Sequence, residues 1–352
     1  MGCFDQRNIL TDDFDYILNS ELEIKRFKNK SFFITGATGF IGSLLIRFLL
    51  YANSKENLDI HIYGMVRNIK KATDLYANYP KDNLQFVVAH LGQNDLHLES
   101  NIDYIIHTAA VTKSKQMVDD PVGTIKTAVN GTEEILKFAI SKAVSSMVYV
   151  SSMEVYGQPL NSEKITEKEL GYIDLTSSRS CYPEGKRMCE LLCTAFSDQF
   201  GLNVKIARLA QTFGAGILPS ENRVFAQFAR SVIKHEDIVL HTEGNSEGNY
   251  VYSADAVKAL LYLLLKGDSK QAYNVSNENN HTTIKNMAQL VINNFGTANE
   301  KVIVDIPKEN MGYAPDVRMW LSNKKLRNLG WKPNVDLVDS YGRLLTWLKY
   351  LS

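Results

Sequence analysis

A glycine-rich turn at residues 36–42 constrains the fold of this chain more than any other feature. The apolar run 31–35 precedes it and is predicted to be a buried parallel strand, and an apolar helix is predicted over 43–51. The turn itself has the spacing G-x-x-G-x-x-G. Glycines at such a turn let the backbone approach a pyrophosphate, and the helix behind it offers free N–H groups and partial positive charge. This strand–turn–helix order predicts a dinucleotide-binding site.

Strand-like and helical segments alternate after this turn. We expect further strands over 58–66, 84–88, 103–110, 146–152, 204–208 and 272–275, and helices over 124–143, 182–200, 224–234, from 255 onward and over 284–295. This alternation predicts an α/β fold with a doubly wound parallel sheet of the Rossmann type. We divide the chain into an N-terminal helical extension (1–30), a dinucleotide-binding domain (31–208) and a smaller α/β substrate-binding lobe (209–352), from which some strands can return to the main sheet.

Composition and charge argue against several classes of protein. The 352 residues hold 39 Lys and Arg and 39 Asp and Glu, so no basic excess points to nucleic acid or to a membrane surface. No apolar run reaches the roughly 20 residues that span a bilayer, and the polar start at 1–8 does not resemble a signal peptide. The four cysteines lack metal-binding spacing. We expect a cytoplasmic protein without a metal site that binds neither nucleic acid nor membrane.

Tyr182 and Lys186 are the first candidates for chemistry. Positions i and i+4 lie on one face of a helix, so the phenol and the ammonium point the same way. A nearby cation favours the phenolate of a group whose pKa is ordinarily about 10, and such a phenol can accept a proton from a hydroxyl near neutral pH. A surface tyrosine above a surface lysine has the same spacing. The spacing alone therefore does not show whether the pair is catalytic, and other segments of the sequence are needed to decide this.

Two further motifs precede this pair in the sequence, and the order of the three is informative. The glycine turn at 36–42, the segment S-S-M-E-V-Y-G at 151–157, and Tyr182 with Lys186 follow one another along the chain. In this order they resemble the extended short-chain dehydrogenase/reductase family, in the branch of nucleotide-sugar epimerases, dehydratases and decarboxylases. The resemblance covers about residues 30 to 350.

The resemblance implies a set of roles. Tyr182 would remove the proton from O4 of a nucleotide sugar, Lys186 would hold the cofactor ribose and lower the Tyr182 pKa, and Ser152 would hydrogen-bond the same sugar oxygen. The cofactor would be NAD or NADP, tightly bound and recycled within each turnover. A homodimer is also implied, paired through the helices near 124–143 and 182–200.

Several positions are expected to contact the cofactor. The second strand ends in Arg67 in place of the acidic residue that commonly binds the NAD ribose, which favours NADP weakly, although a merely exposed arginine would look the same. The small pair Ala109 and Ala110 would let a nicotinamide ribose approach, and Asn130 matches a family landmark. The full predicted cofactor set is Gly36, Thr38, Gly39, Phe40, Ile41, Gly42, Arg67, Ala109, Ala110, Asn130, Tyr182 and Lys186.

Glu154 bears on which reaction follows. Many 4,6-dehydratases of this branch carry an Asp-Glu pair here, whereas this chain has Met153-Glu154, so the candidate base for C5 is kept and the acid is lost. Uronate decarboxylases keep the glutamate in the same way, and the Met-Glu pair also resembles an unusual 5,6-dehydratase type that eliminates the C6 hydroxyl and then reduces C4 again. We therefore expect a dehydratase-like or uronate-decarboxylase-like lyase that works through a transient 4-keto sugar. The alternatives are a 4-epimerase, for which Glu154 is incidental, and a non-catalytic dinucleotide-binding sensor or scaffold.

Three residues are expected to bind the substrate, and one usual contact is missing. Gln211 stands near a position where the family has an asparagine, and Gly248 replaces the usual arginine for the diphosphate. Arg223 or another cation would take over that contact. Arg318 lies in the region where a uronate decarboxylase would grip the substrate carboxylate.

Overall fold

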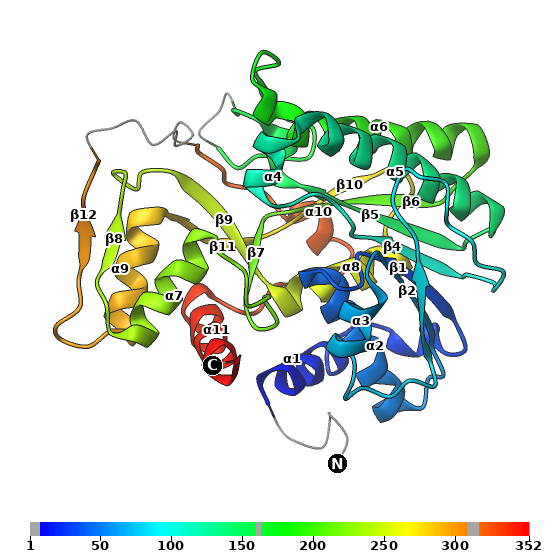
Figure 1. Cartoon of the computed structure of the whole chain (residues 1–352), viewed down its shortest axis with the longest axis horizontal. Coiled ribbons are helices and arrows are strands. Elements are labelled where there is room, and N and C mark those ends of the chain that lie inside the picture. The colour runs from blue at the N-terminus through cyan, green and yellow to red at the C-terminus, as the bar shows by residue number, and fades with distance from the viewer. Residues whose placement is uncertain (1–7, 160–162, 308–316, 352) are drawn as a thin grey trace.

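The computed structural model describes residues 8–159, 163–307 and 317–351. A sheet of seven parallel strands forms its centre, in the order β10-β6-β5-β4-β1-β2-β3 (Figure 1). These strands are β1 (Ser31–Thr35), β2 (His61–Val66), β3 (Leu84–Val88), β4 (Tyr104–His107), β5 (Ser146–Ser152), β6 (Val204–Leu209) and β10 (Ala272–Val275). Strand order reverses between β1 and β4, where open α/β sheets bind ligands beyond the carboxyl ends of the strands. The predicted doubly wound sheet is confirmed.

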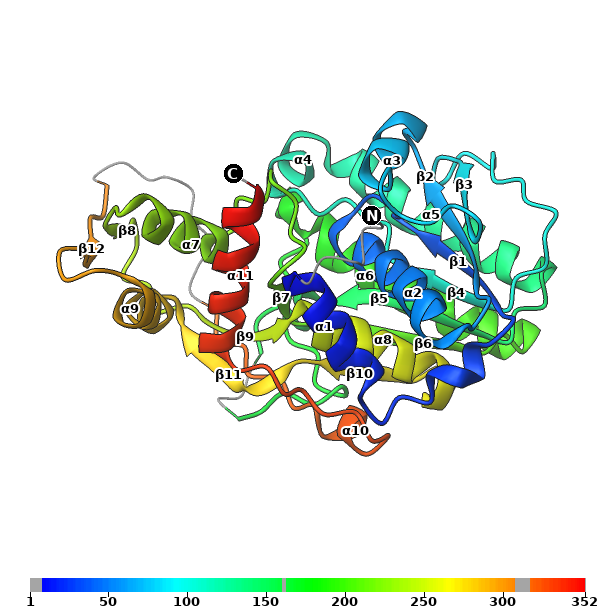
Figure 2. The same cartoon turned by 90° about the horizontal axis from the view of Figure 1, so that it is seen from below.

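Helices cover both faces of this sheet (Figures 1 and 2). One face carries α2 (Phe40–Glu56), α3 (Ile69–Leu75) and α8 (Ser253–Lys266). The other face carries α5 (Pro121–Ser141) and α6 (Cys181–Phe200), with the short α4 (Ser114–Asp119) before α5. Each layer buries its apolar stripe against strands that are themselves buried on both sides, which accounts for the continuous apolar runs in the sequence.

Local sequence sets the ends of the helices near the site. The Asp120 side chain caps α5 by accepting a 2.9 Å hydrogen bond from Gly123 N, and Pro121 occupies the first helical position. Helix α6 ends at Phe200 and is capped by Gly201, whose φ of 71° lies in the left-handed region that glycine enters without strain. These signals fix the start of α5 and the end of α6.

The smaller lobe lies beside the carboxyl edge of the main sheet (Figure 1). It holds a three-stranded sheet, β11-β9-β7, and a two-stranded sheet, β12-β8. Its elements are β7 (Gln211–Phe213), α7 (Val224–Lys234), β8 (Ile238–Leu240), β9 (Glu247–Tyr252), β11 (Asn277–Thr283), α9 (Ile284–Phe295), β12 (Val302–Val304) and α11 (Leu337–Leu351). Two elements from residues 209–352 belong instead to the main part: β10 is a strand of the seven-stranded sheet, and α8 packs on a face of that sheet. The short helix α10 (Lys324–Arg327) packs on β10.

The N-terminal segment ties the two parts together. It forms α1 (Ile9–Leu18) and the short 3-10 helix η1 (Ile24–Phe27), and α1 packs on α2, α8 and α11 (Figure 2). The buried carboxylate of Asp13 accepts hydrogen bonds from Tyr252 on β9 and Arg343 on α11. Tyr16 donates to Asp255 on α8. The first helix therefore bridges the main layer and the smaller lobe.

Candidate active site

The glycine turn forms a cradle at the end of β1. Gly36 has a φ of +69°, and its carbonyl accepts a 2.8 Å hydrogen bond from Gly39 N. A Cβ on Gly42 would lie 2.3 Å from that same carbonyl oxygen, and a Cβ on Gly36 would lie 2.8 Å from Thr108 Oγ1. Side chains are therefore excluded where the strand, the turn and the helix meet.

Helix α2 begins behind this turn without a side-chain cap, since its N-cap residue is Gly39. The first-turn N–H groups of a helix have no acceptor within the helix and carry partial positive charge. Thr38, Phe40 and Ile41 are only partly buried. The cradle thus fits the pyrophosphate of a dinucleotide.

The other predicted cofactor residues differ in how near they lie to this cradle. Ala109, which follows β4, donates its N–H to Thr35 Oγ1 at 3.1 Å and so lies beside the turn, with Ala110 next to it. Arg67 follows β2 and is exposed. Asn130 is exposed on α5, where it packs on Gly92 in the loop after β3.

Ser152, Tyr182 and Lys186 meet at the carboxyl end of β5. Ser152 is the last residue of β5, and a hydrogen bond from it lowers the pKa of the Tyr182 phenol. Tyr182 lies in the first turn of α6, and Lys186 follows one turn later, with its Nζ 5.9 Å from the centroid of the tyrosine ring. The structure thus brings together three residues that the sequence separates.

The pKa of Tyr182 differs from the sequence expectation. Burial and the Glu154 charge raise it to about 12, although the hydrogen bond from Ser152 and the charges of Arg179 and Arg223 oppose this rise. Lys186 was expected to lower this pKa, but its Nζ points to Val150 O at 2.7 Å, and burial lowers its own pKa to about 8. In the protein alone, desolvation of the phenol therefore outweighs the nearby cations.

Glu154 is paired with an arginine that sequence reasoning did not single out. Its Oε2 lies 3.0 Å from Arg179 Nη2, in the short 3-10 helix η3 (Ser178–Ser180) that leads into α6. The Arg179 guanidinium carbon lies 5.9 Å from the Tyr182 ring centroid. The available signal was its place three residues before Tyr182, about one helical turn earlier on the same face.

The three predicted substrate residues come from the smaller lobe. Arg223, just before α7, is held by Glu221 through bonds of 3.0 and 2.8 Å, and its charge reaches Tyr182 strongly enough to lower the pKa of that phenol. Gln211 is partly buried at the start of β7. Arg318 is 75% exposed, and its nearest carboxylate is Glu247 at 3.8 Å. The structure therefore associates Arg223 with Tyr182 but gives no such link for Arg318.

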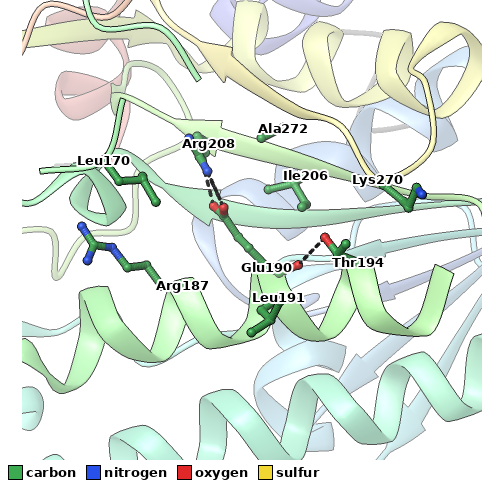
Figure 3. Close-up of a pocket in the computed structure, with 9 residues that line it drawn as sticks. All are labelled: Leu170, Arg187, Glu190, Leu191, Thr194, Ile206, Arg208, Lys270 and Ala272. Carbon is green, nitrogen blue, oxygen red and sulfur yellow. Dashed lines mark hydrogen bonds and ion pairs between the residues drawn. The ribbon is translucent and has the colours of Figure 1, made fainter. Parts of the chain in front are cut away.

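A buried ion pair connects α6 to the neighbouring strand β6. Arg208 on β6 donates to Glu190 on α6, with a shortest distance of 2.6 Å, and Ser151 donates to the same carboxylate at 2.6 Å. Figure 3 shows this pair in a pocket of about 260 Å³. The pocket is lined by Leu170, Arg187, Glu190, Leu191, Thr194, Ile206, Arg208, Lys270 and Ala272. All three of its cations are paired with carboxylates, so the pocket offers no spare charge to a ligand.

The part of the chain that the structure describes holds neither a metal-binding cluster nor a membrane-spanning helix. Residues 8–159, 163–307 and 317–351 contain no group of three or more His, Cys, Asp or Glu side chains placed to hold a metal ion. Within these same ranges, no helix combines the length and the apolar character needed to cross a membrane.

Comparison with known proteins gives consistent matches over most of the chain. The model of the NAD dependent epimerase/dehydratase family matches residues 32–276. UDP-glucuronic acid decarboxylase 6 of Arabidopsis thaliana is 30% identical over 314 residues, covering 88% of this chain and 86% of the plant protein. The UDP-glucose 4-epimerase of Thermotoga maritima has a TM-score of 0.76 at 22% identity, over 91% of this chain and 99% of its own. The UDP-glucuronic acid 4-epimerase of Bacillus cereus, solved with UDP-glucuronic acid and NAD, has a TM-score of 0.75 at 21% identity, over 92% and 100%.

Proposed function

The chain belongs to the NAD-dependent epimerase/dehydratase family, and from this premise we propose that it decarboxylates a nucleotide-linked uronic acid through a transient 4-keto sugar. The observation that carries the proposal is the Glu154–Arg179 pair beside Tyr182, with Met153 in place of the acid that many 4,6-dehydratases of this family carry. The plant UDP-glucuronic acid decarboxylase, similar over 88% of this chain, supports the same reaction.

The cofactor of this family is NAD, and the glycine cradle suits it. Gly36, Gly39 and Gly42 leave room for the pyrophosphate, the uncapped start of α2 offers it N–H groups, and Ala109 leaves space beside the turn. Bound there, NAD would take up a hydride from C4 of the sugar and return it at the end of the turnover. No part of this requires a metal.

The protein side chains would handle the protons. Tyr182 would accept the O4 proton, and Ser152 would hydrogen-bond that oxygen as it becomes a ketone. The uronate is then a β-keto acid, so its C5–C6 bond can break, with carbon dioxide leaving and the electron pair staying as an enolate over C5, C4 and O4. Protonated Tyr182 and Ser152 would stabilise the enolate oxygen, a proton would be delivered to C5, and Tyr182 would return its proton to O4. Glu154 is the candidate for moving the proton at C5.

The direct test is product analysis. We expect the NAD-loaded protein to convert UDP-glucuronic acid to a UDP-pentose with loss of carbon dioxide, detected by mass spectrometry, and to incorporate one deuterium at C5 in D2O. Tyr182→Phe should reduce the rate by a factor of about 10³. Inversion at C4 with the carboxylate retained would identify the 4-epimerase, and loss of water from a neutral hexose would identify the dehydratase. Cofactor binding without turnover of any nucleotide sugar would support the remaining alternative, a non-catalytic dinucleotide-binding sensor or scaffold.

We also propose a homodimer paired through α5 and α6. The two helices lie side by side on the outer face of the sheet (Figure 1). Five large apolar side chains on them are exposed, namely Val122 at 59%, Ile125 at 44%, Met188 at 48%, Leu191 at 60% and Phe200 at 51%. A second copy would cover this apolar surface through a two-fold axis.

A cytoplasmic location is part of the proposal. Cys181, Cys189 and Cys193 are buried free thiols, which suits a reducing compartment. The nucleotide-sugar substrate is expected in the same compartment.

A further inference from the structure

We propose that Arg179 selects substrates with a carboxylate at C6, by exchanging its ion pair with Glu154 for one with the substrate. The inference rests on the proposed function, because it assigns a substrate group to the same site. The sequence alone assigned this role to Arg318.

The Arg179–Glu154 pair is built to exchange partners. Its side chains are 37% and 38% exposed, so neither group is locked in a dry interior. Exposed ion pairs contribute little net free energy, since solvent screens the charges. Replacing one carboxylate by another on the same guanidinium therefore costs little, provided that the second carboxylate is held nearby.

The position of the pair fits a group attached at C5 of the sugar. Tyr182 is expected at O4, and the Arg179 guanidinium carbon lies 5.9 Å from the tyrosine ring centroid. The Arg179 and Glu154 charges act in opposite directions on the Tyr182 pKa, which places both within electrostatic reach of that phenol. C5 is adjacent to C4, so a carboxylate on C5 would approach this pair.

The charge balance makes the arginine selective. When the substrate carries a neutral hydroxymethyl group at C6, the ion pair between Arg179 and Glu154 can remain intact. With a carboxylate at C6, Glu154 and the substrate would repel each other unless a cation lies between them. Arg179 presents a planar fork of N–H donors that can bind a carboxylate in a bidentate manner, which suits this task.

The other arginines are less suited to this role. Arg223 is already held by Glu221 through two bonds, at 3.0 and 2.8 Å. Arg318 is 75% exposed and lies 3.8 Å from Glu247, at the start of β9. Among the cations near Tyr182 in the described chain, Arg179 is the one whose carboxylate partner is itself a predicted site residue.

The test compares binding of UDP-glucuronic acid and UDP-glucose to the NAD-loaded protein by calorimetry. We expect Arg179→Met to weaken UDP-glucuronic acid binding at least tenfold, the order expected for one charge-assisted hydrogen bond, and to change UDP-glucose binding less than threefold. Arg179→Lys, which keeps the charge, should fall between. Glu154→Gln should tighten UDP-glucuronic acid binding severalfold, because it removes the competing carboxylate. Arg26→Met is the matched control, since Arg26 is an exposed arginine near a glutamate away from the site.

Three results would overturn the inference: no preference for the uronate in the native protein, an unchanged preference in Arg179→Met, or loss of the preference in Arg318→Met instead. The proposed function fails separately. If the native protein binds UDP-glucuronic acid through Arg179 but releases no carbon dioxide, the selectivity stands and the decarboxylation does not.

Discussion

Lys186 Nζ donates a 2.7 Å hydrogen bond to the carbonyl oxygen of Val150, two residues before the end of β5. The ammonium also lies 4.7 Å from the centroid of the Tyr149 ring. One of its three N–H donors is therefore fixed to the backbone of the central sheet. We propose that the other two serve a ligand bound next to Tyr182, so that Lys186 acts as an anchored donor and not as a mobile surface charge.

Replacement of Lys186 should separate cofactor binding from stability. We expect Lys186→Met to weaken NAD binding at least tenfold and to lower the turnover rate by about 10² or more, because the donors that face the ligand are lost. The thermal midpoint should change by only a few degrees, since an apolar side chain of similar length refills the space. Fluorescence titration with NAD and a thermal melt measure the two effects. Unchanged NAD affinity would remove Lys186 from the cofactor site.

The Tyr182 pKa should respond in opposite directions to its two charged neighbours. A negative charge disfavours the phenolate, so Glu154→Gln should lower this pKa from about 12, and Arg179→Met should raise it. Carbon-13 NMR of labelled tyrosine measures it, with Tyr182→Phe identifying the resonance. A shift in the same direction for both variants would contradict the arrangement described.

The glycine cradle can be tested with two alanine substitutions. A Cβ on Gly42 would lie 2.3 Å from Gly36 O, so Gly42→Ala should distort the turn and abolish NAD binding. Gly185 is the matched control, because its added Cβ would meet Ala128 Cβ at an ordinary 3.5 Å. Gly185→Ala lies within α6 and should stabilise the protein by about 0.5–1 kcal/mol. NAD titration and urea unfolding distinguish the two, and wild-type NAD affinity in Gly42→Ala would count against the cradle.

Removing one partner of the buried Arg208–Glu190 pair should lower the free energy of unfolding strongly, whereas replacing both partners by apolar residues should lower it much less. The side chains are 6% and 10% exposed, so Arg208→Met leaves a buried carboxylate without its cation and should destabilise the protein by about 3–5 kcal/mol. Adding Glu190→Leu should restore much of this loss, because no charge then remains buried. Urea unfolding of the two single variants and the double variant completes the cycle. A double variant as unstable as the sum of the singles would exclude coupling.

The apolar surface on α5 and α6 predicts how the protein associates. Leu191→Glu places a charge in the proposed interface and should shift the protein from dimer to monomer in sedimentation velocity experiments. Ile306→Glu, at an exposed apolar position in the smaller lobe, should leave the dimer intact. A monomeric native protein would refute the proposed pairing.

Much of the fold could be predicted where an element is long or is marked by local sequence signals. The strand over 31–35, the helices over 224–234 and 284–295, and a parallel doubly wound sheet all follow from apolar runs and caps. The short strands β7, β8 and β12 were not predicted. Each has three residues, too few to show a period, so they are strands only because a partner lies alongside.

The amino-acid sequence alone determined the features that depend on neighbouring residues: the glycine turn that opens α2, and Tyr182 and Lys186 one turn apart on α6. Steric limits and helix periodicity act over a few residues, so such motifs carry their geometry with them. Only the tertiary structure decided which charges meet. Glu154 pairs with Arg179 across 25 residues, and Asp13 bonds to Arg343 across 330. An ion pair depends on where the whole chain has folded, and no local pattern records that.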